Sequence, residues 1–474
     1  MTNRTYIKDL KNFIGEEVTI AGWVDIRRDQ GKMIFLDFRD MTGKVQGVIL
    51  PSYLETLEIG KTLRNEFVVK IKGKVNKRPE RNIKERILNG DIELEIMEIE
   101  VLNQAITPPF DVTTDGKELG EENRLKYRYL DLRRPRMQKN IRNRHNIAKF
   151  VRDFLDKEGF IEIETPILTK STPEGARDYI VPSRLYQGMF YALPQSPQQY
   201  KQLLMASGME KYFQIARCMR DEDTRGDRQP EFTQLDMEMS FVEKENVMDV
   251  NERLLIDLVT KLYPEKKIQE IPFPRITYKE AMEKYGSDRP DFRKDKNNPN
   301  LLAFGWVIEF PFFERTDKSD NPNTEGEWTF THNPFSEPIK EHKEWLLEKK
   351  NLGEIITTQY DIILNGYEIG GGSIRAHQAE TLRKVLKIIG HKDEDIDKNF
   401  GHMLNAFQTG TPPHGGIAWG FDRLVMLLEN EPNIREVIAF PKTGEGKDLM
   451  MDSPSTVSDK QLKELGININ EKPE

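Results

Sequence analysis

In residues 1–105, apolar and polar positions alternate with the period of two that is typical of half-buried strands. The runs are VTIAGWVDI, MIFLDF, VQGVIL, FVVKIKGKV and DIELEIMEIEVL. Five strands in so short a stretch favour a small closed barrel of the OB type, a fold that often binds single-stranded nucleic acid. A β-barrel or a sandwich edge without a ligand is the alternative that the strand count leaves open.

The pattern changes after residue 105. Residues 106–135 contain paired prolines and then a charged stretch rich in tyrosine and arginine, which predicts a linker. From Arg142 to Glu158 the spacing of apolar residues predicts an amphipathic helix, which Gly159 is expected to end. The apolar face of this helix comprises Ile147, Phe150, Val151, Phe154 and Leu155. FIEIETP predicts a short strand after it.

Residues 136–474 mix short strands, helices and glycine-rich turns. YDIILNGYEIGGGSIRAH predicts two strands joined by a turn, HQAETLRKVLKII predicts a helix, and GGIAWGFDRLVMLLEN predicts a strand followed by a helix. Hairpins mixed with helices indicate an α+β domain with an antiparallel sheet flanked by helices, and not a doubly wound domain. Residues 286–300 and 314–328 are expected to form polar loops.

Composition narrows the class of protein. The 474 residues are 37% hydrophobic and 32% charged, and the net charge is −8, so nucleic-acid contacts would need local basic patches. Cys218 is the single cysteine, which excludes an intramolecular disulfide and a cysteine-based zinc cluster. No apolar run approaches the ~20 residues of a membrane helix, and no signal peptide is visible. We therefore expect a cytosolic protein without a membrane partner.

The first candidate for chemistry is the charged stretch CMRDEDTRGDRQPEFTQLDME, residues 218–238. The two commonest nucleotide signatures are absent, so arginines would have to grip a phosphate. Arg220, Arg225 and Arg228 lie in this stretch, and Arg423 lies in the first turn of the apolar helix GFDRLVMLL. A solvated charged hairpin and a surface ion pair at Arg423 are the alternatives for these segments taken singly.

The second candidate is YDIILNGYEIGGGSIR, in which Asp361, Glu368 and Arg375 are spaced seven residues apart. Two carboxylates near phosphate-binding arginines can hold Mg²⁺, and the glycines 370–372 allow a ligand to lie against the sheet. A glycine-rich bulge with solvated acids is the alternative. Gln198 and Lys201 share one face of another predicted helix. The few histidines do not match a zinc-ligand spacing, so we predict no structural metal.

The ordered set of these segments resembles the class II aminoacyl-tRNA synthetases, and most closely the bacterial-type aspartyl-tRNA synthetases, over nearly the whole chain. Residues 156–174 resemble the first class II motif, with Pro166 at a dimer interface, residues 218–238 the second, and GIAWGFDRLVMLL the third. The strings that match the aspartyl branch are RLKYRYLDLRRP, TPEGARDY, ALPQSPQQYK, NGYEIGGGSIR and VIAFPKT.

The resemblance implies a cytoplasmic homodimer that uses ATP and Mg²⁺ to activate L-aspartate and transfers it to tRNA(Asp). It also implies an OB-fold anticodon-binding domain at 1–105, a linker at 106–135 and a class II catalytic domain at 136–474. Catalysis would consist of positioning and charge stabilisation, so no side-chain nucleophile is needed.

For ATP, the resemblance implies that Arg220 grips the α-phosphate and the substrate carboxylate, and that Arg423 clamps the γ-phosphate. Asp361 and Glu368 would hold Mg²⁺, and Glu222 would contact the adenine end. The further ATP-site positions are Asp221, Gln229, Phe232, Gly420, Phe421 and Asp422. The ring of Phe232 is expected to stack on adenine.

For the amino acid, the resemblance places Glu174 and Gln198 near the α-amino group. Lys201 and Arg375 would face the side-chain carboxylate, and Asp236 and His332 would complete the pocket. Two cations that face one carboxylate select aspartate over asparagine, because the neutral side chain would leave buried charge unpaired.

For tRNA, the resemblance implies that Phe35, Gln46 and Glu93 stack on and hydrogen-bond to anticodon bases. Arg225 and Asp223 would approach the acceptor end. Gln30 stands where leucine-like and histidine variants track with strict or relaxed tRNA choice, and glutamine is neither. Charging of both tRNA(Asp) and tRNA(Asn) is therefore the main alternative function.

Two departures from the family accompany the resemblance. The large insertion between the second and third motifs is absent, and a short loop at about 286–300 replaces it. Asn333 stands where many relatives have a second histidine. An ammonia-dependent asparagine synthetase is disfavoured by the barrel, and a plain OB-type RNA-binding protein is disfavoured by the set Arg220, Glu368, Arg375 and Arg423.

Overall fold

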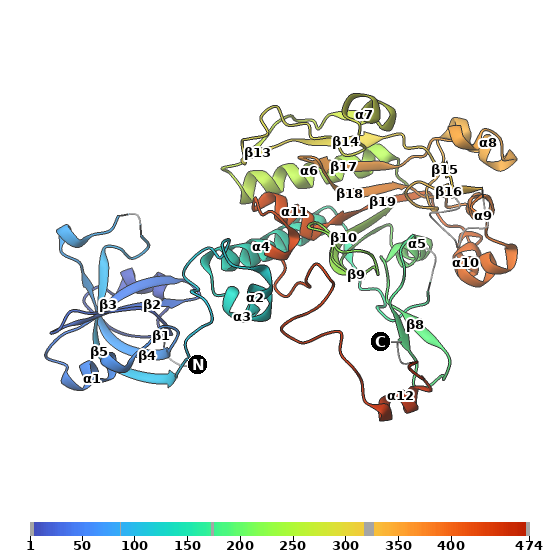
Figure 1. Cartoon of the computed structure of the whole chain (residues 1–474). Helices are drawn as coiled ribbons and strands as arrows, with labels where there is room; N and C mark the ends of the chain where they lie inside the picture. The colour runs from blue at the N-terminus through green and yellow to red at the C-terminus, as the bar shows by residue number, and fades with distance from the viewer. Residues whose placement is uncertain (1–3, 86, 172–174, 317–326, 471–474) are drawn as a thin grey trace. The chain divides into compact units, whose positions relative to one another are not determined.

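A computed structural model describes residues 4–85, 87–171, 175–316 and 327–470. The chain divides into two compact units, Met1–Lys117 and Glu118–Glu474 (Figure 1). The division falls within the stretch expected to be a linker, and residues 118–135 pack in the second unit. The functional domain boundaries drawn from the sequence stay a prediction.

The first unit is a closed five-stranded barrel with strand order β1-β2-β3-β5-β4. Its strands are β1 (Glu17–Asp29), β2 (Ile34–Asp40), β3 (Gly43–Ile49), β4 (Val68–Lys77) and β5 (Ile92–Asn103), with helix α1 (Leu54–Thr62) between β3 and β4. Alternate residues such as Ile34, Leu36 and Phe38 fill the interior. The predicted OB-type barrel is confirmed, because each predicted run forms one of these strands.

The second unit is built on an eight-stranded sheet with order β12-β14-β17-β18-β19-β10-β9-β6. The strands are β6 (Ile161–Glu162), β9 (Lys211–Met219), β10 (Glu231–Ser240), β12 (Arg275–Thr277), β14 (Phe304–Ile308), β17 (Tyr360–Leu364), β18 (Tyr367–Ile374) and β19 (His414–Gly420). The central pairs are antiparallel, as predicted, whereas β12 with β14 and β6 with β9 are parallel. The sheet is therefore mixed at its edges.

Small two-stranded sheets and short helices complete this unit. The strand pairs are β7 (Ile180–Pro182) with β8 (Phe190–Ala192), β11 (Lys267–Ile268) with β13 (Leu301–Leu302), and β15 (Phe313–Arg315) with β16 (Trp328–Phe330). The short helices are α2 (Glu121–Lys126), α3 (Arg128–Asp131), α5 (Gln198–Ala206), α7 (Tyr278–Tyr285), α8 (Lys343–Glu348), α9 (Ala379–Ile388), α10 (Asp393–Phe407) and α12 (Asp459–Leu465). The 3-10 turns are η1 (Ile7–Phe13), η2 (Glu80–Asn82), η3 (Lys340–His342), η4 (Leu352–Glu354) and η5 (Ile434–Glu436).

One face of the large sheet packs against α4 (Pro135–Lys157), α6 (Lys244–Leu262) and α11 (Phe421–Leu428) (Figure 1). Strand β10 shows how the two faces differ. Leu235, Met237 and Met239 point into this apolar core, so the intervening Asp236 and Glu238 lie on the opposite face. The packing of the apolar side chains of β10 therefore determines which face of the sheet carries Asp236 and Glu238.

Helix α4 begins at Pro135, seven residues before the predicted start, so the prediction of Arg142 was wrong. Proline is favourable in a first helical turn, where its missing N–H costs nothing. The early turns are held by tertiary contacts, since Met137 is buried and the Asn140 amide donates to the Glu436 carbonyl oxygen at 3.1 Å. Gly159 follows the helix with φ +82°, as expected of a helix stop.

Of the two polar loops predicted from the sequence, the structure describes the first completely and the second in part. Residues 286–300 contain no helix or strand, so the polar loop predicted there is confirmed. Of the loop at 314–328, residues 317–326 lie outside the described part, and the residues on either side belong to the hairpin of β15 and β16. None of the helices that the structure describes has the length and apolar character that a membrane crossing requires.

Candidate active site

Most of the predicted site residues meet on the sheet face opposite α4, α6 and α11. Two adjoining cavities lie there, of about 210 and 540 Å³. Both are lined by Arg220, Glu222, Arg228, Gln234 and Glu368. The two cavities are thus parts of one charged cleft.

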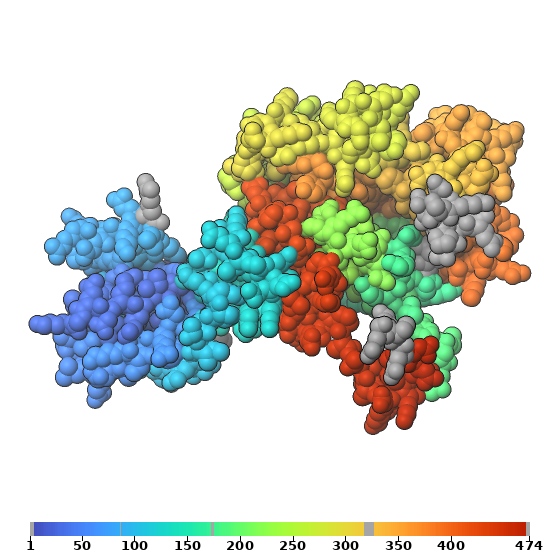
Figure 2. Space-filling view, in the orientation of Figure 1, coloured from blue at the N-terminus to red at the C-terminus, as the bar shows by residue number. Residues whose placement is uncertain are grey.

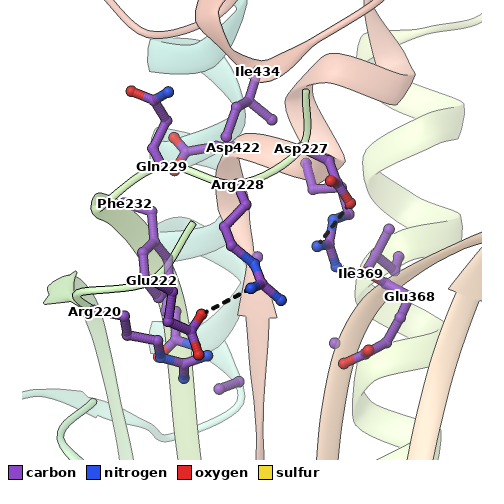
Figure 3. Close-up of a pocket in the computed structure, with 15 residues that line it drawn as sticks. Arg220, Glu222, Asp227, Arg228, Gln229, Phe232, Glu368, Ile369, Asp422 and Ile434 are labelled. Atoms are coloured by element: carbon purple, nitrogen blue, oxygen red, sulfur yellow. Dashed lines mark hydrogen bonds and ion pairs between the residues drawn. The ribbon is translucent and has the colours of Figure 1, made fainter. Parts of the chain in front are cut away.

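The smaller cavity is rich in arginine (Figure 3). The Arg220 guanidinium lies over the Phe232 ring, 5.1 Å from its centroid, and Arg228 Nη1 is 3.2 Å from Glu222 Oε2. Among the described residues, the buried Nε of Arg220 has no hydrogen-bond partner. An aromatic face beside arginines with free donors suits a ligand with a flat ring and phosphate groups.

Arg423 closes the other side of the smaller cavity, in the first turn of α11. Its Nη2 is 3.1 Å from Asp227 Oδ2, and its Nη1 donates to the carbonyl oxygen of Glu368. The helix α11 thus brings a cation and the N–H groups of its first turn to the same cavity, an arrangement that suits an anion.

Two further residues of the smaller cavity, Gln229 and Asp422, form hydrogen bonds that connect neighbouring segments. The Gln229 side chain is 2% exposed, and its Oε1 accepts a hydrogen bond from the Lys442 backbone N–H at 2.8 Å. Asp422 Oδ2 accepts one from the Thr233 backbone N–H at 2.8 Å, which ties α11 to β10. Gly420 precedes α11 as its N-cap.

Two residues predicted for this site lie outside the cavity lining. Phe421 is 1% exposed and packs in the apolar core, because it faces inward on α11. Asp221 is exposed, and its backbone N–H donates to the carbonyl oxygen of Arg177 at 3.0 Å. Residue spacing alone did not distinguish them from their cavity-lining neighbours.

The larger cavity is built around a buried network of charges. Lys201, from the first turn of α5, lies 2.7 Å from Asp236 Oδ1 and 3.2 Å from Glu238 Oε2. Arg375 forms a bidentate pair with Glu238, at 2.9 and 3.1 Å. Each side chain is at most 3% exposed. Glu238 therefore joins the two cations that were predicted to line the amino-acid pocket.

The sequence motifs gave no indication of Glu238. Burial opposes its ionisation, but the charges of Arg375 and Lys201 outweigh this effect and lower its pKa to about 2. Burial raises the pKa of the neighbouring Asp236 in spite of Lys201. The signal that could have revealed Glu238 is its place two residues after Asp236, on the same face of a strand.

Other predicted residues of the larger cavity are Gln198 and His332, which both line it. The Nε2 of Gln198 is buried without a hydrogen-bond partner among the described residues. The His332 ring packs edge-on against Phe310, with centroids 4.5 Å apart, and burial lowers its pKa although Glu368 opposes the shift. Glu174 lies outside the described residues.

Asp361 and Glu368 lie together over Gly371. A Cβ atom at Gly371 would be 2.8 Å from Asp361 Oδ1 and 3.4 Å from Glu368 Oε1. Burial and the charge of Glu368 raise the pKa of Asp361 well above its ordinary value. Two carboxylates over a space that only glycine leaves open fit Mg²⁺, which takes one or two protein carboxylates and completes its shell with phosphates and water.

Asn333, the departure from the family pattern, lines the larger cavity and is linked to Asp361 through Gln359. Its Nδ2 donates to Gln359 Oε1 at 3.2 Å, and Gln359 Nε2 donates to Asp361 Oδ1 at 2.6 Å. Asn333 therefore helps to orient the amide that bonds to Asp361.

The predicted tRNA residues of the barrel lie on its outer surface. Phe35 alternates with buried Ile34 and Leu36, and it is partly exposed. Gln46 accepts a hydrogen bond from Arg28 at 3.3 Å, and the register of β3 and β5 places Glu93 beside Gln46. Gln30 is exposed after β1. In the second unit, Asp223 and Arg225 are exposed in the turn between β9 and β10.

Comparison with known proteins gave two family matches. Residues 120–444 match the family described as "tRNA synthetases class II (D, K and N)". Residues 18–102 match the family described as "OB-fold nucleic acid binding domain".

Curated relatives match over nearly their full length. The aspartate–tRNA(Asp/Asn) ligase of Dehalococcoides mccartyi (strain CBDB1) is 40% identical, with 97% of this chain and 98% of the relative covered. The aspartate–tRNA ligase of Staphylococcus aureus (strain NCTC 8325 / PS 47) is 40% identical, with 96% and 97% covered. The first alignment spans 595 positions, more than the 474 residues of this chain, so the relative has segments that are absent here.

Among solved structures, the asparaginyl-tRNA synthetase from Pyrococcus horikoshii complexed with asparaginyl-adenylate has a TM-score of 0.74 and 24% identity. The match covers 94% of this chain and 99% of that one, and it shows a shared fold.

The network around Glu238 leads to a prediction about stability. Glu238→Gln should lower the free energy of unfolding by about 3–5 kcal/mol, because it leaves two buried cations short of a partner. The folded-state pKa of Glu238 is lowered, so its contribution is complete above its ordinary pKa of about 4.3 and is lost as the pH falls toward 2. Urea unfolding should therefore show a gap between wild type and variant that narrows over this window.

The matched control is Glu162→Gln, which removes an exposed partner of Arg152. This substitution should change the unfolding free energy by less than about 1 kcal/mol. Equal effects of the two substitutions would contradict the role assigned to Glu238.

Proposed function

Because the chain belongs to the class II tRNA synthetases of the D, K and N group, we propose that it is an aspartate–tRNA ligase that uses ATP. The observation that carries the choice of aspartate is the pair of buried cations, Lys201 and Arg375, in a cavity next to the arginine-lined one. The proposed reaction has two steps, formation of aspartyl-adenylate and transfer of the aspartyl group to the 3′ end of tRNA(Asp).

Selection of aspartate rests on donors that the protein leaves available. The hydrogen bonds of Arg375 to Glu238 and Ser373 use three of its five N–H donors. Among the residues that the structure describes, Lys201 pairs with Asp236 and Glu238, which leaves one of its three N–H donors. A substrate carboxylate can take these donors, whereas the amide of asparagine would bring no charge to balance the cations.

In the proposed first step, the α-carboxylate of aspartate attacks the α-phosphorus of ATP and pyrophosphate leaves. We assign Arg220 to the α-phosphate and the reacting carboxylate, Phe232 to the adenine ring, and Arg423 to the γ-phosphate. Glu222 and Gln229 complete the ATP site. Arg220 and Arg423 have buried Nε atoms without a partner among the described residues, which supports a role in binding anions.

Asp361 and Glu368 would hold Mg²⁺, which neutralises phosphate charge when it is bound. Gln198 is assigned to the α-amino group, together with Glu174. His332 and Asp236 would complete the amino-acid pocket. The neutral state that burial favours for His332 suits a hydrogen-bonding role rather than a charged one.

For the second step we assign the barrel face with Phe35, Gln46 and Glu93 to the anticodon, and the exposed Asp223 and Arg225 to the acceptor end. The partly exposed position of Phe35 supports stacking on a base. The place of action would be the cytoplasm, where tRNA is charged.

We also propose a homodimer. Exposed apolar side chains cluster where the backbone of Thr169 bonds to that of Ala192, at 2.8 and 3.0 Å. They include Ile167, Leu168 and Phe190, which are 50%, 54% and 50% exposed, close to the exposed Pro166. A second copy of the chain would cover such a patch.

Aspartate-dependent ATP–pyrophosphate exchange tests the first step. The wild type should exchange with aspartate and not with asparagine, and only when Mg²⁺ is present. Arg220→Ala should reduce exchange by about 10²–10³-fold or more, because it removes a charge at the reacting centre. Arg217→Ala is the control, since Arg217 is exposed on β9, three residues before Arg220, and pairs with Glu231. Exchange with asparagine, or none with aspartate, would overturn the proposal.

The second candidate function is a ligase that charges both tRNA(Asp) and tRNA(Asn). It is favoured by the exposed Gln30 and by relatives whose names include both tRNAs. Aminoacylation of purified tRNA(Asp) and tRNA(Asn), measured side by side, distinguishes the two functions. Faster charging of tRNA(Asp) supports the first proposal, and comparable rates replace it with the second.

Sedimentation velocity at micromolar concentration tests the homodimer. The wild type should sediment with twice the mass of one chain, and Leu168→Asp should shift it to the monomer by placing a charge in the covered patch. Leu54→Asp is the control, because Leu54 is 72% exposed on the barrel. A wild type that sediments as a monomer would contradict the proposal.

A further inference from the structure

The short segment η5 touches the loop that borders the smaller cavity. Ile434 lines this cavity, and its backbone N–H donates to the carbonyl oxygen of Gly226 at 3.0 Å. Arg435 Nη1 donates to the carbonyl oxygen of Arg225 at 3.5 Å. The backbone at 225–226 therefore rests on η5 and not on its own hairpin alone.

Arg435 is oriented from its other side by Glu121, the first residue of α2. The pair is bidentate, with Nη2 3.2 Å from Glu121 Oε2 and Nε bonded to Oε1. This geometry fixes the plane of the guanidinium, and the Arg435 side chain is only 13% exposed. In Figure 2 the red C-terminal residues fill the space between the cyan start of the second unit and the green hairpin.

The segment η5 and the residues after it are bonded to two buried arginines, Arg128 and Arg124. Arg128 donates to the carbonyl oxygens of Arg435, Ile438 and Ala439 at 2.6–2.8 Å. Arg124 forms a bidentate pair with Glu436 at 2.7 and 2.9 Å. Because these buried contacts fix η5, the side chain of Arg435 can act as a support for the loop.

The loop matters because the residues after Gly226 carry the ion pairs of the cavity wall. Asp227 pairs with Arg423 at 3.1 Å, and Arg228 pairs with Glu222 at 3.2 Å (Figure 3). A shift of the backbone at 225–226 would move both side chains. The position of the cavity's cations thus depends on what supports this backbone.

We propose that Arg435, oriented by Glu121, is a positioning residue that holds the 225–228 loop in the geometry that binds ATP. Arg435 does not itself line the cavity, so it acts through Asp227 and Arg228. The inference rests on the proposed function, since it concerns the site assigned to ATP. A plain surface ion pair at the same place would affect neither ATP binding nor, to any large extent, stability.

The test is calorimetric titration of ATP with Mg²⁺ into the full chain. Arg435→Ala should raise the Kd for ATP about fivefold, equivalent to about 1 kcal/mol, and Glu121→Gln and Arg435→Lys should have smaller effects. The control is Arg152→Ala, because Arg152 forms a similar bidentate pair with Glu162, at 2.9–3.1 Å, on α4 and β6. The thermal midpoints of all four variants should stay close to that of the wild type.

The outcomes separate the inference from the proposed function. A wild type that binds no ATP defeats the proposed function. A wild type that binds ATP, with an unchanged Kd in Arg435→Ala and Glu121→Gln, overturns the inference alone. The inference is also overturned if Arg435→Ala changes only the KM for tRNA, because Arg435 would then be an RNA contact. The double variant Glu121→Arg, Arg435→Glu should not recover the Kd, because a carboxylate at position 435 cannot donate to the carbonyl oxygen of Arg225, and its recovery would overturn the inference.

Discussion

Glu238 is the residue on which the candidate active site depends, because its negative charge stabilises two buried cations. Taking Lys201 and Arg375 out of water costs several kcal/mol each, and only a close counter-charge offsets that cost. Glu238 meets both of them and stays ionised with a pKa of about 2. The pocket can therefore present positive charge to a carboxylate without being unstable in its absence.

The alternation of strand β10 links this charge network to the core. Met237 lies in the apolar cluster with α4, α6 and α11. Its neighbours Asp236 and Glu238 lie on the opposite face of the strand and pair with Lys201. A register shift of one residue would exchange the two faces, so the core fixes where the carboxylates stand. The order of the strands brings in Arg375, the second cation that pairs with Glu238. Arg375 directly follows β18, and only β19 lies between β18 and β10 in the sheet.

The two cavities differ in how their cations are supported. In the larger cavity, the partners of Lys201 and Arg375 are rigid strand residues. In the smaller cavity, Arg228 belongs to a loop and pairs with Glu222, while Arg423 is the rigid member on α11. A loop can adapt to a ligand at lower cost than a strand, but it needs support from outside, which here comes from η5.

The sequence alone determined the local features of this protein. Period-two alternation predicted the barrel strands, residues 360–377 predicted two strands joined by a turn, and the motifs pointed to Arg220, Glu368 and Arg423 as candidates for the site. The tertiary structure decided what depends on contacts between distant segments: the start of α4 at Pro135, the burial of Phe421, the role of Glu238 and the support from Arg435. The reason is physical, because local patterns report the preferences of neighbouring residues. Burial and ion pairing depend on which segments the fold brings together.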